Sequence, residues 1–167
     1  MIILFIGNAI ALLASLVMVY SGFLKEKKKI LFVQTIQIGL FILSNIVLGG
    51  ITGVINNLLN AIQNILCYKD KLGLREKIII TILSIILSIA FNNMGLIGLL
   101  PLISTVLYIW LMNIKDVIKF KILIISTIAM WLIYNIAIQS YITTIFNFAT
   151  ITANCISIYQ LKRKRIK

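Results

Sequence analysis

Apolar runs alternate with short basic clusters along the whole chain. Four runs contain no Asp, Glu, Lys or Arg: residues 1–24, 30–68, 78–114 and 122–161. A transmembrane helix needs about 20 apolar residues, so the first run fits one crossing and each longer run fits two. With breaks placed at glycine and amide clusters, the pattern predicts seven transmembrane helices. Their expected ranges are 2–24, 30–48, 51–68, 78–92, 95–113, 120–138 and 141–161.

The charges predict how these helices are oriented. All sixteen Lys and Arg lie in the basic clusters, together with the four acidic residues. The three turns expected on the other side carry no charge: Gly49-Gly50 with Gly53, Asn92-Asn93 with Gly95, and Gln139-Ser140. Because basic loops stay in the cytoplasm, we expect the N-terminus outside and the C-terminus in the cytoplasm.

Composition agrees with a protein that lies in the lipid bilayer. The chain is 61% hydrophobic and only 12% charged, whereas soluble domains are about one quarter charged. The net charge of +12 does not indicate nucleic acid binding, because every basic residue flanks an apolar run. The first run has neither a basic n-region nor a small-residue cleavage site, so we expect a spanning helix rather than a cleaved signal peptide.

Two parts of the chain resemble each other at a fixed spacing of 90 residues. Three asparagines then align without a gap with three others: Asn45, Asn57 and Asn64 with Asn135, Asn147 and Asn154. Four crossings separate the starts of the two copies, so both copies enter the membrane in the same direction. The predicted fold is an all-α membrane protein with two parallel three-helix repeats joined by a linker helix, a 3+1+3 arrangement. Its parts are a first repeat (1–68), a loop and linker helix (69–93), a second repeat (94–161) and a basic cytoplasmic tail (162–167).

Small and polar residues form one stripe on the third helix and one on the seventh. Steps of four and three residues place each set on a single helix face: Gly53, Asn57, Asn60, Asn64 and Cys67, and Thr143, Asn147, Thr150, Asn154 and Ser157. Amides donate and accept hydrogen bonds without carrying charge, and aromatic rings can pack against a flat solute. The candidate substrate-binding residues are therefore Asn57, Asn147, Asn60, Asn64, Asn154, Asn45 and Asn135, with Phe41 and Trp131.

The sequence leaves more than one function open. The absence of ionisable groups inside the membrane favours a small, mostly neutral solute over a charged ligand or a carboxylate-based proton relay. The same amides could instead hold helices together in an assembly or sensor protein that transports nothing, and a lipid or polyprenyl flippase is a third alternative. Without histidine or an intramembrane acid the chain has no general base, so we expect no enzyme, no cofactor and no metal; Cys67 and Cys155 fit as apolar fillers. A homo-oligomer is left open.

The predicted architecture resembles the SWEET, PQ-loop and PnuC-like transporter superfamily. SWEET facilitators hold their substrate between two three-helix bundles with one asparagine from each of helices 3 and 7. By register, Asn57 and Asn147 match those positions, with Asn60 and Asn154 as alternatives one turn further along. The resemblance implies a uniporter-like facilitator for a sugar, nucleoside or vitamin that works by alternating access.

A second resemblance is to the YgjV-type bacterial inner membrane proteins. It rests on short motifs in the right order: Leu99-Leu100-Pro101, Leu59-Asn60-Ala61-Ile62, Trp131-Leu132-Ile133-Tyr134-Asn135, and Asn154 followed by Tyr159 and a basic tail. Members of that family place an arginine three residues after the asparagine of helices 3 and 7. This chain has Gln63 and Ser157 there, which argues against an anionic ligand. The resemblance implies a multi-pass protein of the bacterial plasma membrane.

Overall fold

The computed structural model describes residues 2–47, 51–92, 95–137 and 141–166, and these residues form seven α-helices and one short 3-10 helix. The helices are α1 (Ile2–Phe23), α2 (Lys27–Val47), α3 (Ile51–Tyr68), α4 (Leu74–Ala90), η1 (Ile97–Leu99), α5 (Leu100–Leu111), α6 (Val117–Ala137) and α7 (Tyr141–Ile166). The prediction of an all-helical chain with seven α-helices is therefore confirmed for the described residues. The three predicted neutral turns fall largely outside them, at residues 48–50, 93–94 and 138–140.

Several helix boundaries differ from the prediction: α5 spans Leu100–Leu111 instead of 95–113 and follows η1, and at α4 and α6 a polar group caps the helix start. α4 begins four residues before the expected start at 78, because the Gly73 N–H donates to the Glu76 carboxylate at 3.0 Å. α6 begins at Val117 instead of 120, because the carboxylate of Asp116 accepts from two amides of the first turn. α7 continues to Ile166, through most of the expected tail.

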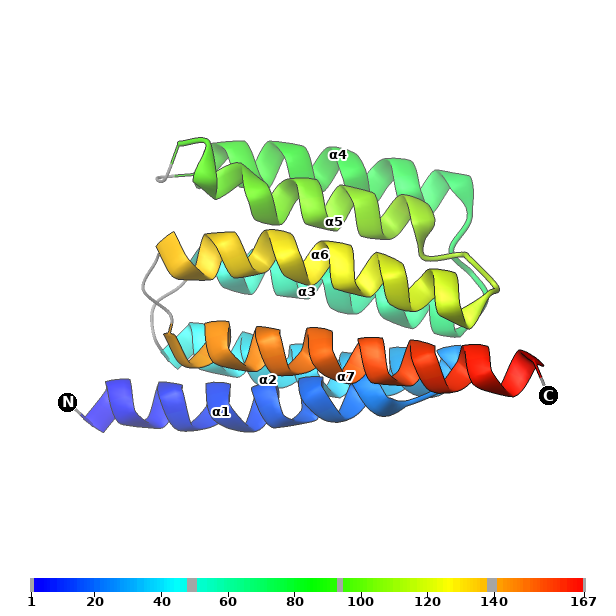
Figure 1. Cartoon of the computed structure of the whole chain (residues 1–167). Coiled ribbons are helices and arrows are strands. Elements are labelled where there is room, and N and C mark those ends of the chain that lie inside the picture. The colour runs from blue at the N-terminus through cyan, green and yellow to red at the C-terminus, as the bar shows by residue number, and fades with distance from the viewer. Residues whose placement is uncertain (1, 48–50, 93–94, 138–140, 167) are drawn as a thin grey trace.

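The helices lie side by side in an elongated bundle (Figure 1). α1 packs along α2 and α7, α2 packs along α3, and α6 packs along both α5 and α7. A shorter contact joins α3 to α5, so these six helices close into a ring. α4 lies outside the ring, against α3 and α5. The ring therefore has two seams between the first three helices and the last three, α1–α7 and α3–α5.

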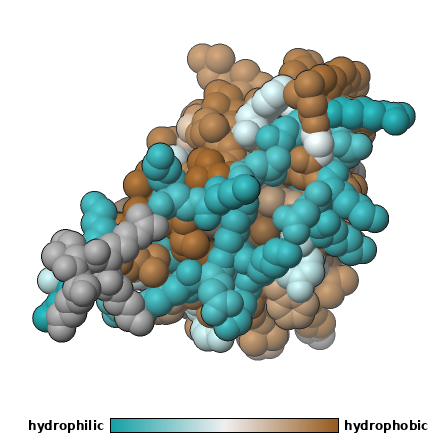
Figure 2. All heavy atoms as spheres, turned by 90° about the vertical axis from the view of Figure 1, so that its right-hand side faces the viewer, coloured by the Kyte–Doolittle hydropathy of each residue, from teal (hydrophilic) through white to brown (hydrophobic). Residues whose placement is uncertain are grey.

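The two ends of the bundle differ in charge. The α1–α2, α3–α4 and α5–α6 connections and the C-terminus lie at one end, which we call the basic end (Figure 1). The N-terminus lies at the opposite, neutral end. Hydrophilic side chains cover much of the basic end in the view along the bundle (Figure 2). The charge separation read from the sequence thus corresponds to a separation in space.

Four of the helices that the structure describes are long and apolar enough to cross a membrane: α1, α2, α6 and α7. α3 has 18 residues, but five amides between Asn56 and Asn64 lower its hydropathy. α4 and α5 are shorter, with 17 and 12 residues. The sides of the bundle expose many large apolar side chains, as a surface facing lipid does.

Candidate functional site

A cavity of about 320 Å³ lies inside the six-helix ring. Residues from α1, α2, α3, α5, α6 and α7 line it, and none comes from α4. Eight of the nine predicted substrate-binding residues lie on its wall: Phe41, Asn45, Asn57, Asn60, Asn64, Trp131, Asn135 and Asn147. The helical stripes and the aromatic pair therefore face one shared space. Asn154 is the exception and does not line the cavity.

The cavity wall follows the 90-residue spacing found in the sequence. Of its 26 lining residues, 20 form ten pairs that lie 90 positions apart. The pairs are 18/108, 34/124, 37/127, 38/128, 41/131, 44/134, 45/135, 53/143, 57/147 and 60/150. Corresponding positions of the two halves thus face the same space, although only three of these pairs have identical residues: Ile38/Ile128, Asn45/Asn135 and Asn57/Asn147.

Several polar groups on this wall have no hydrogen-bond partner among the described residues. Both amide atoms of Asn64, Nδ2 of Asn147, Oε1 of Gln37 and Oγ1 of Thr105 are buried and unpaired. A buried unpaired polar group costs about 1–3 kcal/mol. Four such residues on one cavity wall are therefore a site where a hydrogen-bonding molecule would be stabilised.

Other polar groups on the wall are already occupied. The hydroxyl of Tyr108 donates to Oε1 of Gln34 at 3.0 Å, which joins α5 to α2 across the ring. The hydroxyls of Thr127 and Thr150 donate to carbonyls of their own helices, at 2.9 and 2.8 Å. Ser44 donates to the carbonyl of Gly7 at 2.8 Å and so joins α2 to α1. These contacts hold the walls of the cavity together.

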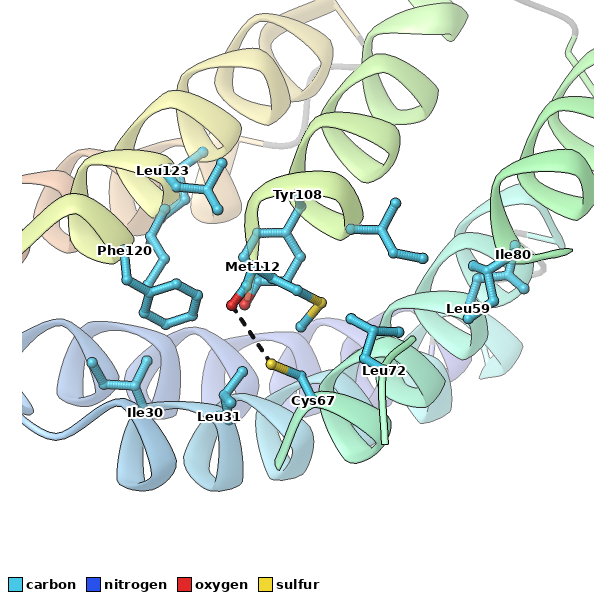
Figure 3. Packing of buried hydrophobic residues seen from close by; sticks show 13 residues of the cluster. Ile30, Leu31, Leu59, Cys67, Leu72, Ile80, Tyr108, Met112, Phe120 and Leu123 are labelled. Atoms are coloured by element: carbon cyan, nitrogen blue, oxygen red, sulfur yellow. Dashed lines mark hydrogen bonds between the residues drawn. The ribbon is translucent and has the colours of Figure 1, made fainter. Parts of the chain in front are cut away.

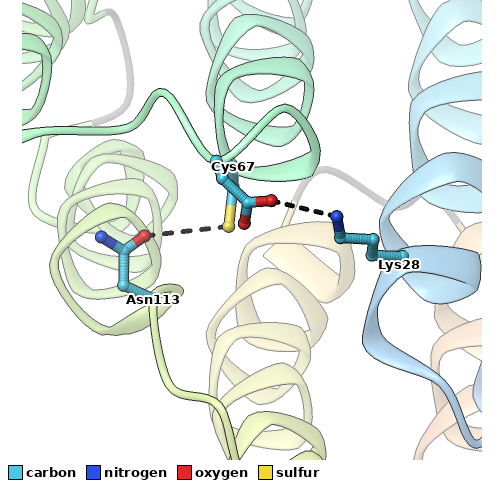
Figure 4. Close-up of polar contacts among 4 residues, drawn as sticks. Lys28, Cys67 and Asn113 are labelled. Carbon is cyan, nitrogen blue, oxygen red and sulfur yellow. Dashed lines mark hydrogen bonds and ion pairs between the residues drawn. The ribbon is translucent and has the colours of Figure 1, made fainter.

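An apolar cluster packs in the bundle (Figure 3), and those of its members that lie nearest the basic end are buried and do not line the cavity. Its 13 buried members are Ile30, Leu31, Leu59, Cys67, Leu72, Ile80, Tyr108, Ile109, Met112, Phe120, Leu123, Ile124 and Ile128. The Cys67 thiol lies between α3 and α5 and donates weakly to the Met112 carbonyl at 3.6 Å (Figure 3) and to the Asn113 side chain at 3.8 Å (Figure 4). Figure 4 also shows the Lys28 ammonium, which pairs at 3.0 Å with the Asp70 carboxylate on the exposed surface.

Lys121 is a functional candidate that the sequence reasoning missed. It was assigned to a water-facing basic cluster, but the structure places it in α6 with 0% of its surface exposed. Its ammonium donates to the carbonyl of Gly22 at 2.8 Å and to Oδ1 of Asn154 at 3.2 Å. Asn154 also donates to the Thr150 carbonyl at 2.9 Å, so its amide is occupied. The sequence signal was the position of Lys121 at the start of an apolar run, one turn inside a helix that begins at Val117.

A comparison with protein families identifies the class of the molecule. The model of the family described as bacterial inner membrane protein, Imp-YgjV, matches residues 5–165. The chain belongs to the YgjV family of bacterial inner membrane proteins. No curated protein and no solved structure matches it. The predicted YgjV resemblance is confirmed, and with the apolar helices the YgjV family match makes this a multi-pass inner membrane protein.

Proposed function

We propose that this YgjV-family protein is a facilitator that carries a small neutral polar solute across the inner membrane. The observation that carries the proposal is the cavity, because it combines unpaired amides with walls built from repeat-related positions. None of the described residues that line it is Asp, Glu, Lys, Arg or His. Its volume of about 320 Å³ is near the lower end of the usual range for ligand pockets, about 300–1,000 Å³. A monosaccharide, nucleoside or vitamin of similar size fits these limits.

The proposed machinery is a 3+1+3 arrangement of seven spans. α1–α3 form one unit, α5–α7 form the other, and α4 connects them on the outside of the ring. The ten repeat-related pairs on the cavity wall support this division, since each unit then contributes the same surface to the site. Rocking of one unit against the other would open the two ends in turn. With the basic end in the cytoplasm, the members of the apolar cluster nearest that end lie on the cytoplasmic side of the solute.

The main alternative is a protein that transports nothing and uses its amides as contacts between helices. Such contacts exist: Ser88 of α4 donates to Asn56 of α3 at 3.4 Å, and Lys121 binds Asn154. The cavity residues Asn64 and Asn147 carry buried atoms without a partner among the described residues, as Gln63 does off the cavity. The gathering of four residues with such atoms on the wall of one cavity supports a ligand site over packing alone.

The test is a thermal-shift screen of purified protein against neutral sugars, nucleosides, vitamins and amino acids, followed by uptake of each hit into proteoliposomes. A solute that binds only the folded protein raises its stability by about 2.7 kcal/mol at one hundred times its dissociation constant. We expect the double variant Asn57→Ala/Asn147→Ala to lose both the shift and the uptake while staying folded, because both side chains line the cavity.

The matched control is Asn56→Ala, which removes a neighbouring amide that faces α4. It should lower the melting temperature and leave the solute affinity unchanged. Wild-type uptake in the double variant would contradict the proposed site. No shift and no uptake with any solute, combined with lower stability of every asparagine variant, would favour the non-transporting alternative.

A further inference from the structure

The two halves of the bundle differ at one pair of equivalent asparagines. Asn64 and Asn154 lie 90 residues apart, and both are buried, with 1% of their surface exposed. Asn64 lines the cavity with both amide atoms unpaired. Asn154 lies off the cavity and has partners on both atoms, the ammonium of Lys121 and the carbonyl of Thr150. Identical residues at equivalent positions therefore have opposite surroundings.

Lys121 supplies the partner of Oδ1 in Asn154, and the first half has no equivalent of it. Its counterpart 90 residues earlier is Leu31, a buried residue of the apolar cluster. A buried ammonium is costly unless acceptors surround it, and Lys121 has two uncharged acceptors, the carbonyl of Gly22 and Oδ1 of Asn154. One side chain of α6 thus binds α1 and α7 together, whereas Leu31 forms no such bond.

The seam between α1 and α7 is also tightly packed at this point. A Cβ added at Gly22 would lie 2.8 Å from Cβ of Ala153 and 3.0 Å from Nδ2 of Asn154, so glycine is needed for the approach. Phe120, next to Lys121 in the chain, packs against Tyr108 of α5 with ring centroids 6.1 Å apart. The hydrogen bonds of Lys121 to α1 and α7 therefore hold α6 in the position in which Phe120 packs into the apolar cluster.

We propose that Lys121, Gly22 and Asn154 form a latch that holds the basic end of the cavity closed, and that Asn64 alone of the asparagine pair serves the solute. This inference rests on the proposed function for the role of Asn64. The latch joins the first unit, through α1, to the second unit, through α6 and α7, so opening of the basic end requires its release. Asn154 is then a positioning residue and not a ligand residue.

The native thiols offer a direct readout of the latch. Cys67 is buried in the apolar cluster at the basic end, and Cys155 is exposed on α7. In a Cys155→Ser background, the rate at which a maleimide modifies Cys67 reports how often the cluster opens. We expect Asn154→Ala to raise this rate about tenfold, because it removes one of the two acceptors of Lys121 and the only one on α7. Asn154→Asp keeps an oxygen acceptor for the ammonium and should restore slow modification.

Leucine variants at Asn64 and Asn154 test the different roles of the two asparagines without any added solute. Asn64→Leu replaces an unpaired buried amide by an apolar side chain of similar size, so the melting temperature should stay equal or rise. Asn154→Leu removes one of the two acceptors of the buried Lys121 ammonium and leaves only the Gly22 carbonyl, so the melting temperature should fall. Equal effects at the two positions, or a Cys67 rate that is the same in wild type, Asn154→Ala and Asn154→Asp, would overturn the proposal.

Uptake separates failure of this inference from failure of the proposed function. Glucose and uridine serve as the monosaccharide and nucleoside probes. If either is transported and Asn154→Asp weakens its apparent affinity as much as Asn64→Ala, Asn154 is a ligand residue and the inference is wrong while the transport function stands. If neither is transported but the Cys67 rates follow the expected order, the latch is supported and the choice of solute fails.

Discussion

At the scale of single residues, the surroundings of a side chain decide its role more than its chemical type does. Asn56, Asn64 and Asn154 are all buried amides, yet one binds a serine of α4, one faces the cavity unpaired and one accepts from a lysine. An interhelical amide contact in a membrane contributes about 0.6–2 kcal/mol. An unpaired amide makes no such contribution, and Asn64 is one of several buried residues with unpaired side-chain atoms among those the structure describes.

Two glycines test the close approach of α1 to α7. Gly22→Ala should destabilise the protein by about 1–3 kcal/mol, because its new Cβ would overlap the fixed Cβ of Ala153 at 2.8 Å. Gly39→Ala is the matched control: nothing lies within 4 Å of its added Cβ, and removing a helical glycine should stabilise by about 0.5–1 kcal/mol. Thermal unfolding in detergent measures both. Equal effects would show that α1 and α7 are not in contact at Gly22.

Residue spacing predicted which asparagines share the cavity wall, with the exception of Asn154. Steps of three and four place stripe residues on one face whatever the tertiary structure, so Asn57, Asn60 and Asn64 reached a common cavity wall. The same rule places Asn154 on the stripe of α7, but Asn154 does not line the cavity and accepts from Lys121 of α6. A partner 33 residues away on another helix is not encoded in the periodicity of α7.

At the scale of elements, α4 has two contrasting faces. Its buried residues are Lys77, Ile80, Ser84 and Ser88, which recur with helical spacing toward α3 and α5. The Lys77 ammonium donates to the Trp110 carbonyl at 3.1 Å, and the Trp110 indole donates to Thr81 at 3.2 Å. The opposite face exposes isoleucine and leucine side chains. A polar inner face and an apolar outer face fit a linker helix that packs on the ring and meets lipid.

A pair of serines tests this orientation of α4. Ser88→Leu should destabilise the protein by about 1–3 kcal/mol, because the side chain is buried against α3 and its bond to Asn56 is lost. Ser126→Leu is the control on α6, where the serine is exposed and binds only a carbonyl of its own helix. Its effect should stay within about 0.5 kcal/mol. If thermal unfolding showed a larger loss of stability for Ser126→Leu than for Ser88→Leu, the assignment of Ser88 to the inner face of α4 would be wrong.

At the scale of the whole molecule, the sequence predicted the number of helices and their connection at one charged end. Apolar length and charge position are local properties, so both could be read without knowing which helices touch. The unequal seams could not be read in this way. α1 and α7 pack closely around Lys121, whereas α3 and α5 meet over a shorter contact that α4 covers. This asymmetry depends on one lysine and on the linker, neither of which the 90-residue repeat duplicates.

The orientation in the membrane is a prediction for the molecule as a whole. All four basic clusters of the sequence belong to one end of the bundle, and moving so many cations across the membrane is strongly disfavoured. Alkaline phosphatase, which is active only outside the cytoplasm, should therefore be inactive when fused after Gly73 at the basic end. The same enzyme should be active when fused after Asn92, one helix later at the neutral end. The reverse pattern would place the basic end outside, and the members of the apolar cluster nearest that end would then lie toward the exterior.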